Sequence, residues 1–123
     1  MEFATFKCSI KNLAFLEDNV YNFNGQIDKV NRIIDYLEGD ISVKLKYDDN
    51  VEIVRDHNEY RIGMKFILNE TTKGCYLLKE NSSEIEFDLF TYTLSISETS
   101  ITINYMINND EKEKYEYNIE WSK

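Results

Sequence analysis

The sequence contains no proline, four glycines and a single histidine in 123 residues. Turns must therefore be built mainly from Asn, Asp, Ser and Glu, which hydrogen-bond to their own backbone or tolerate turn geometry. The lone His57 has no Ser or Cys partner in a recognisable motif, which is a poor signal for nucleophilic catalysis. We interpret it as an exposed turn residue, and we predict a protein that is not an enzyme and uses no cofactor.

Basic residues are also scarce. Fourteen Lys and Arg stand against 23 Asp and Glu, which gives a net charge of −9 and a pI near 4.6. Nucleic acids and anionic membrane surfaces are recognised by basic faces, so both are disfavoured as partners. The charge permits a basic protein partner, although an acidic surface that keeps the protein soluble is the simpler interpretation.

Long apolar runs and cysteine motifs are missing as well. The N-terminal region has neither a signal peptide nor a membrane-spanning stretch, so we expect a cytoplasmic protein. Cys8 and Cys75 lie in apolar runs and outside any C-x-x-C or Cys/His cluster, which predicts two buried, reduced thiols and no metal site. Asp48-Asp49-Asn50 lacks the further ligands of a calcium loop and is explained as a turn.

The apolar residues that are present are mostly Ile, Tyr and Phe, which favour strands. Residues 41–47 alternate, with Val43 and Leu45 on the inner face and Ser42 and Lys44 on the outer face. A three-residue loop, with Asn50 in the left-handed region, keeps the next strand in register. The apolar positions then change parity, so a four-residue loop over 56–59 is predicted, with Arg55 opposite Tyr60.

Further strands follow at close spacing. A polar loop over 69–74 precedes strands near 74–79, 85–96, 101–107 and 115–121, and a change of phase near Phe90 indicates a bulge. Two strands near 6–10 and 20–27 open the chain. Eight or more antiparallel strands in one domain, residues 1–123, predict an all-β fold that closes into a barrel. The predicted interior comprises Ile41, Val43, Leu45, Ile53, Ile62, Met64, Phe66, Leu94 and Ile103.

Residues 26–39 are ambiguous. Ile27, Val30, Ile34 and Leu37 have helical spacing, and Gly39 would end a helix well, so periodicity alone favours a short helix. As a hairpin, the same segment places Val30, Ile34 and Tyr36 on one face and leaves the charged Arg32 unexplained.

The order of several short motifs resembles the YwiB-like family of uncharacterised bacterial proteins. Gly25 is followed by Tyr36-x-Glu38, by Val51-x-Ile53-x-Arg55, by Met64-x-Phe66 and by Tyr76. The turns after Arg55 and after Tyr76 depart from the family pattern. The resemblance implies a calycin-type, lipocalin-like antiparallel barrel over about residues 6–121 and a hairpin rather than a helix over 26–38. It implies no particular activity.

Arg55 is the unusual residue of the predicted interior. It is in phase with Val51 and Ile53, and an unpaired charge inside a barrel is costly. Glu38, in phase with Tyr36, is the candidate partner, and Arg55, Glu38 and Tyr36 are the predicted ligand-binding residues. The simpler alternative, which we favour, is that Arg55 extends outwards to water from the end of its strand.

Two functions follow from these expectations. The first is a non-enzymatic protein that holds a small apolar or amphipathic ligand in its barrel, an inference from fold analogy. The second is a filled barrel that serves as a protein-interaction or assembly module through its acidic surface. Bulky inward residues such as Phe6, Tyr47 and Phe66 favour a filled interior. The sequence leaves open whether the protein is a monomer or a homodimer.

Overall fold

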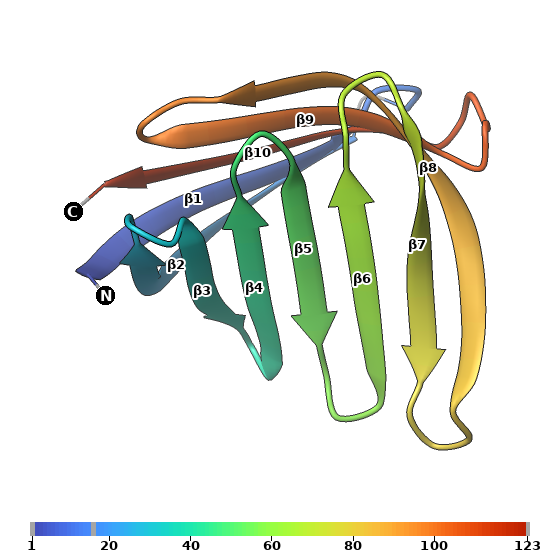
Figure 1. The fold of residues 1–123 in the computed structure, drawn as a ribbon, viewed down its shortest axis with the longest axis horizontal. Helices are drawn as coiled ribbons and strands as arrows, with labels where there is room; N and C mark the ends of the chain where they lie inside the picture. The colour runs from blue at the N-terminus through green and yellow to red at the C-terminus, as the bar shows by residue number, and fades with distance from the viewer. Residues whose placement is uncertain (1, 16, 123) are drawn as a thin grey trace.

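A computed structural model describes residues 2–15 and 17–122. Within these residues, ten antiparallel strands form one closed barrel (Figure 1). The strands are β1 Glu2–Asn12, β2 Glu17–Asp28, β3 Ile33–Glu38, β4 Ile41–Tyr47, β5 Val51–Asp56, β6 Tyr60–Phe66, β7 Thr71–Leu78, β8 Ser83–Ile96, β9 Ser100–Ile107 and β10 Lys114–Ser122. The same residues include no helix long and apolar enough to cross a membrane.

The strands form a simple meander. Each strand pairs with the next along the chain, and β1 closes the barrel by pairing with both β2 and β10. Successive hairpins therefore alternate between the two ends of the barrel. The β2–β3, β4–β5 and β8–β9 turns share one end, whereas the β3–β4 and β5–β6 turns share the other.

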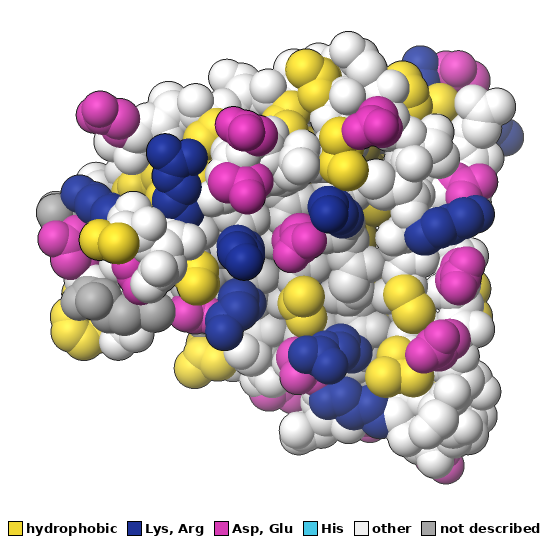
Figure 2. Space-filling model, in the orientation of Figure 1, with side chains coloured by type: hydrophobic (Ala, Val, Ile, Leu, Met, Phe, Trp, Pro, Cys, Tyr) yellow, Lys and Arg dark blue, Asp and Glu magenta, His cyan; other side chains and the backbone are white. Residues whose placement is uncertain are grey.

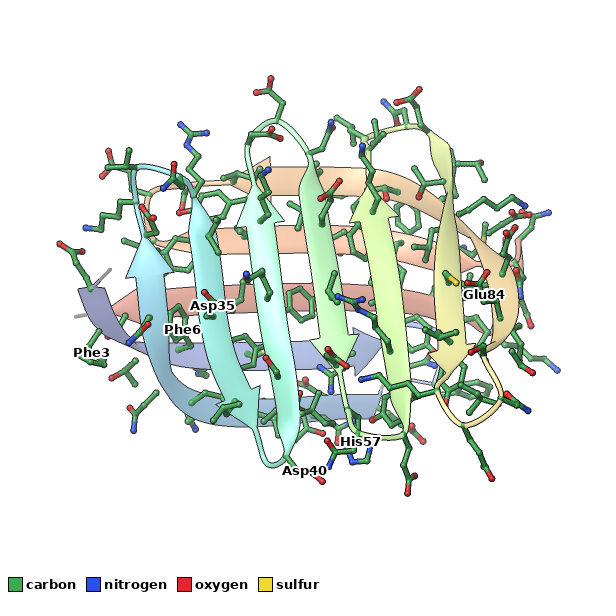
Figure 3. All side chains as sticks on the ribbon, turned by 60° about the horizontal axis from the view of Figure 1, so that its bottom comes forward. Phe3, Phe6, Asp35, Asp40, His57 and Glu84 are labelled. Atoms are coloured by element: carbon green, nitrogen blue, oxygen red, sulfur yellow. The ribbon has the colours of Figure 1, made fainter. Side chains whose placement is uncertain are left out.

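The barrel is flattened into two layers whose strands cross (Figures 1 and 3). One layer contains β3 to β7, and the other contains β9, β10 and β1. Two long strands join them: β8 pairs with β7 through its first half and with β9 through its second half. Strand β2 pairs with β1 along its length but with β3 only from Gly25 to Asp28. The predicted bulge is confirmed, because the β8–β9 register shifts between Thr91 and Thr93.

Aromatic rings fill the interior. The ring of Trp121 lies 5.9 Å from that of Tyr47 and 6.4 Å from that of Phe6. The series continues from Phe6 to Tyr36 at 6.1 Å and from Tyr36 to Phe23 at 4.8 Å, each measured between ring centroids. These separations are typical of packed aromatic pairs. The barrel is therefore held together by side chains that cross it from wall to wall.

The predicted inner face is confirmed. Val43, Leu45, Ile53, Phe66 and Ile103 are buried, and Ile41, Met64 and Leu94 pack against them; Ile62 is half-buried. Ser42 and Lys44 face solvent. Complete burial of one such aliphatic or aromatic side chain contributes about 1.5–3 kcal/mol, so this alternation is a large part of the stability of the fold.

The helical interpretation of residues 26–39 is wrong, and the hairpin is confirmed. Ile27 pairs with Ile34, and both are buried, whereas Val30 lies in the intervening turn with 91% of its surface exposed. Arg32 closes that turn with a φ of 55°. Pairing of Ile34 and Tyr36 with β4 buries both residues, and this outweighs the helical spacing.

Three local predictions are also corrected. Arg55 pairs with Ile62 instead of Tyr60, and the backbone N of His57 donates to the carbonyl of Tyr60 at 2.9 Å, which leaves a two-residue loop. Residues 71–74 belong to β7 and not to a loop. Asn50 is not in the left-handed region; its backbone N instead donates to Oδ1 of Asp48 at 2.8 Å, which closes the β4–β5 turn.

Charged side chains of both signs alternate over the visible face of the β3–β7 layer (Figure 2). On this face Lys and Arg are interspersed with Asp and Glu, and no broad patch of one sign forms. Lys65 and Glu52, for example, lie on neighbouring strands with 3.6 Å between Nζ and Oε1. The net charge of −9 is therefore not gathered on this side of the barrel.

Candidate functional site

The predicted site residues come together on the inner wall near the β3–β4 end of the barrel. Glu38 ends β3, Arg55 lies on β5, and β4 runs between them. Nη2 of Arg55 lies 2.6 Å from Oε2 of Glu38, and each side chain is 22% exposed. The favoured expectation that Arg55 extends to water is therefore wrong, and pairing with Glu38 is what the structure contains.

Three further polar groups lie beside this pair. The hydroxyls of Tyr36 and Tyr117 are 3.4 Å apart, and both side chains are buried. Burial away from water is the main reason that the pKa of each tyrosine is raised. Burial likewise raises the pKa of the Cys8 thiol, and the nearby Glu38 carboxylate adds to this. Cys8 is therefore kept protonated and is a poor nucleophile.

Both cysteines are free. Cys8 is buried as predicted, but Cys75 on β7 is only half-buried. The two thiols therefore differ in their access to solvent.

His57 is more enclosed than predicted. Its side chain is 18% exposed, and its ring stacks on Tyr60 with 4.9 Å between ring centroids. Nε2 lies 2.9 Å from Oδ2 of Asp40, a residue of the β3–β4 turn (Figure 3). His57 therefore joins two neighbouring turns, so the interpretation as an exposed turn residue is wrong.

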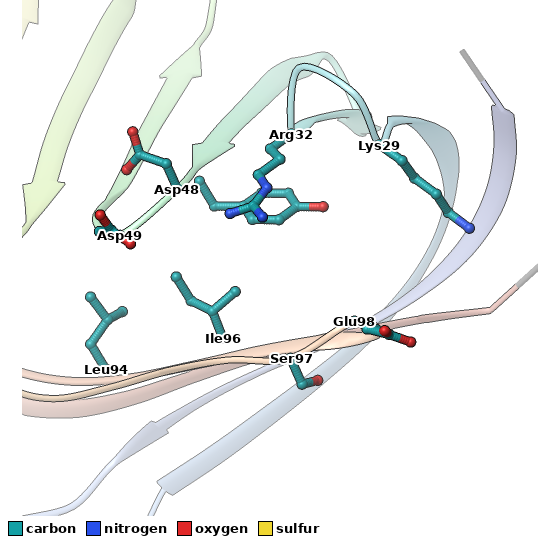
Figure 4. A pocket seen from close by; sticks show the side chains of 9 residues that line it. Lys29, Arg32, Asp48, Asp49, Leu94, Ile96, Ser97 and Glu98 are labelled. Carbon is teal, nitrogen blue, oxygen red and sulfur yellow. The ribbon is translucent and has the colours of Figure 1, made fainter.

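A cleft of about 830 Å³ opens at the opposite end of the barrel, between the two layers (Figure 4). Its apolar floor is formed by Leu94 and Ile96 of β8, and Tyr47 at the end of β4 contributes a wall. The volume falls in the range of about 300–1,000 Å³ that is typical of small-molecule sites. Arg55 and Glu38 do not line this cleft.

Charged residues from three turns surround the floor. Lys29 and Arg32 come from the β2–β3 turn, Asp48 and Asp49 from the β4–β5 turn, and Glu98 from the β8–β9 turn. From the sequence, Asp48 and Asp49 were interpreted as turn residues, and Arg32 had no explanation. The order of the strands could have indicated the cleft, because in a meander every second hairpin turn lies at the same end of the barrel.

A second, smaller hollow of about 390 Å³ lies on the outer surface over β1 to β4. Phe3 and Leu37 line it with exposed fractions of 80% and 66%, and Tyr36 also borders it. Exposed apolar groups in such proximity are typical of contact surfaces. Among the described residues, no group of three or more His, Cys, Asp or Glu could hold a metal ion.

Comparison with known proteins supports the fold. A crystal structure of the ywiB protein from Bacillus subtilis matches with a TM-score of 0.68 and 15% sequence identity, over 98% of this chain and 89% of that chain. No family model matches the sequence, and no curated protein matches it. The resemblance inferred from the order of motifs is thus confirmed at the level of fold, and at this identity it carries no statement about activity.

Proposed function

We propose that the protein is a non-enzymatic binding protein that holds a small amphipathic molecule in the cleft at the β4–β5 end of the barrel. The observation that carries this proposal is a cleft of about 830 Å³ with an apolar floor and a charged rim. An apolar floor with a few polar groups around it is the usual composition of a ligand site. The calycin-like character of the barrel and a cytoplasmic location, which two free cysteines favour, belong to the same proposal.

The filled interior supports a ligand at the mouth instead of one deep in the barrel. Phe6 and Phe66 are fully buried, and the ring of Tyr47, which lines the cleft, packs against that of Trp121. A ligand near Arg55 and Glu38 would have to displace an ion pair and the rings around it. The cleft requires no such rearrangement.

The groups around the cleft do not form a catalytic set. Among the described residues that line the cleft, Ser97 carries the one aliphatic hydroxyl, and its Oγ lies 2.8 Å from the hydroxyl of Ser100. A serine nucleophile needs a neighbouring base to remove its proton. Binding without chemistry is therefore the function that this arrangement favours.

The proposal can be tested by titration with octyl glucoside below its micelle concentration. Trp121, the only tryptophan, packs on Tyr47 and so reports occupancy of the cleft by fluorescence. We expect a saturable signal, weakened several-fold by Leu94→Asn and unchanged by Leu37→Asn on the outer surface. Calorimetry provides the affinity independently, and thermal unfolding verifies that each variant is folded. Absence of saturable binding, or equal binding by Leu94→Asn, contradicts the proposal.

The second candidate is a filled barrel that acts as a protein-interaction module. The outer hollow beside Phe3 and Leu37 favours it, and the net charge of −9 would suit a basic partner. Native mass spectrometry of protein purified from its own host separates the two candidates. A retained small molecule supports the first, whereas a bound protein chain supports the second.

A further inference from the structure

Charges of opposite sign line the cleft without neutralising each other. Lys29 is paired with Glu2, at 3.6 Å between Nζ and Oε2, but Arg32 forms no ion pair among residues 2–15 and 17–122. The same holds for Asp49 and Glu98 within these ranges. The Arg32 guanidinium and the carboxylates thus border the same cleft, and the space between them is open to a ligand (Figure 4).

The backbone fixes Arg32 in this position. The residue adopts a φ of 55°, in the left-handed region that a non-glycine residue occupies infrequently. Its carbonyl accepts a hydrogen bond of 3.0 Å from the backbone N of Tyr47, which ties the β2–β3 turn to the end of β4. The side chain is left to project into the cleft above the apolar floor. A planar guanidinium held in this way is suited to a carboxylate or a phosphate.

The acidic side is equally well defined. Oδ1 of Asp48 accepts the Asn50 backbone N–H, which orients this carboxylate within the turn. Asp49 follows it in the same turn, whereas Glu98 of the β8–β9 turn lies across the cleft from both (Figure 4). The carboxylates would repel a simple anion, because like charges close together are unfavourable. A simple cation would pair with a carboxylate and would leave Arg32 without a counter-ion.

We propose that the cleft binds a zwitterionic amphiphile. The anionic group of the ligand lies at Arg32, its cationic group lies at the neighbouring Asp48 and Asp49, and its apolar part covers Leu94 and Ile96. This inference deepens the proposed function and rests on it, since it names the chemical class of the ligand for the same cleft.

The test compares four probes whose apolar chains contain seven or eight carbons. They are octanoate, octyltrimethylammonium, N-octyl-N,N-dimethylglycine and the neutral octyl glucoside, each titrated with Trp121 fluorescence and calorimetry as readouts. We expect the dimethylglycine compound to bind about tenfold more tightly than any of the others. Its carboxylate accepts a charge-assisted hydrogen bond from Arg32, and its quaternary ammonium group is attracted to the carboxylates, in addition to the apolar contact. This advantage should shrink as salt is added.

Matched variants assign the two charges of the ligand. Arg32→Gln and Asp49→Asn should each bring the dimethylglycine compound down towards the affinity of octyl glucoside. Arg61→Gln, which removes an exposed cation from β6, should leave it unchanged. Because Gln has the same backbone requirements as Arg at position 32, the fold should be retained, and thermal unfolding checks this.

The possible failures are distinguishable. Tightest binding of octanoate or of octyltrimethylammonium overturns the zwitterion assignment, as does equal binding of all four probes. In each of these cases the proposed function stands, because the cleft still binds an amphiphile. If none of the four binds, the proposed function itself fails.

Discussion

Glu38 and Arg55 form an ion pair that spans the intervening strand β4, with 2.6 Å between Oε2 and Nη2. The two residues flank β4 near the end of the barrel where Tyr36 and Tyr117 also meet. Each charge is mostly removed from water, so each depends on the other for compensation. The pair links β3 to β5 independently of the backbone hydrogen bonds of the sheet.

Replacing Arg55 with alanine should destabilise the protein by about 2 kcal/mol, because partial exposure places the pair between exposed pairs, at about 0–1, and buried pairs, at about 3–5. Urea denaturation at neutral pH measures the loss. Glu38→Ala should cost a similar amount. If the pair is the cause, the double variant should cost clearly less than the sum of the two single variants. Additive losses would show that the two side chains act separately.

Stability should fall at alkaline pH. Burial raises the pKa of Tyr36, Tyr105 and Tyr117 above the ordinary value of 10.0, and burial together with a bond to Glu113 raises that of Tyr115 to about 12. Above pH 10 these tyrosines ionise in the unfolded chain but stay protonated in the folded chain. Ionisation therefore stabilises the unfolded state relative to the folded state. Each such tyrosine should remove about 1.4 kcal/mol of stability per pH unit until its folded pKa is passed.

Urea midpoints measured from pH 8 to pH 11.5 test this expectation. Ionisation of these tyrosines should leave the urea midpoint unchanged below about pH 9 and should lower it above pH 10. Tyr36→Phe removes one titrating group and should make the decline of the midpoint with pH shallower. The slopes are compared after each protein is referred to its own midpoint at pH 8. An unchanged slope in Tyr36→Phe would mean that Tyr36 does not hold its proton in the folded state.

The two thiols should react at different rates. Cys75 is half-buried, whereas Cys8 is buried and its pKa is raised, so a thiol reagent should modify Cys75 first in the folded protein. Cys75→Ser should remove the fast phase, and denaturant without reductant should reveal two reactive groups in the parent protein. Detection of no thiols in freshly purified protein would contradict the free state of both cysteines.

The faces of the strands could be predicted from the sequence because a strand has a strict two-residue period. Val43 and Leu45 had to share a face, and Ser42 and Lys44 the other. The prediction even survived an error of two residues in the β5–β6 register, since a shift by two keeps every side chain on its side. The same error misplaced His57, whose position depends on the loop length alone.

The site was less predictable because it depends on how strands are arranged and not on their period. The Glu38–Arg55 pair required β3 and β5 to flank one strand. Glu38 could be named as the candidate partner, but the helical spacing of residues 26–39 meant that β3 was indicated only by the family resemblance. That ambiguity also hid the cleft. Only with the β2–β3 hairpin in place does the meander bring Arg32, Asp49 and Glu98 to the same end of the barrel.

Gly25 provides a sharp test of how β2 leaves the β3 layer. It pairs with both Ala4 and Tyr36 at the point where the β2–β3 ladder ends. A Cβ at this position would lie 2.5 Å from the backbone oxygen of Asp35 and 2.9 Å from Cε2 of Phe6. The first of these atoms belongs to a paired backbone and cannot move aside cheaply.

Gly25→Ala should therefore destabilise the barrel by about 1–3 kcal/mol, the usual cost of overpacking. Gly63→Ala is the matched control, because a Cβ at Gly63 on β6 has no other atom within 4 Å. This variant should be neutral or should stabilise the protein by about 0.4–1 kcal/mol, since alanine has less freedom to lose on folding. Chemical denaturation of both variants gives the comparison. Equal stability of the two would mean that β2 and β3 are further apart at Gly25 than the structure places them.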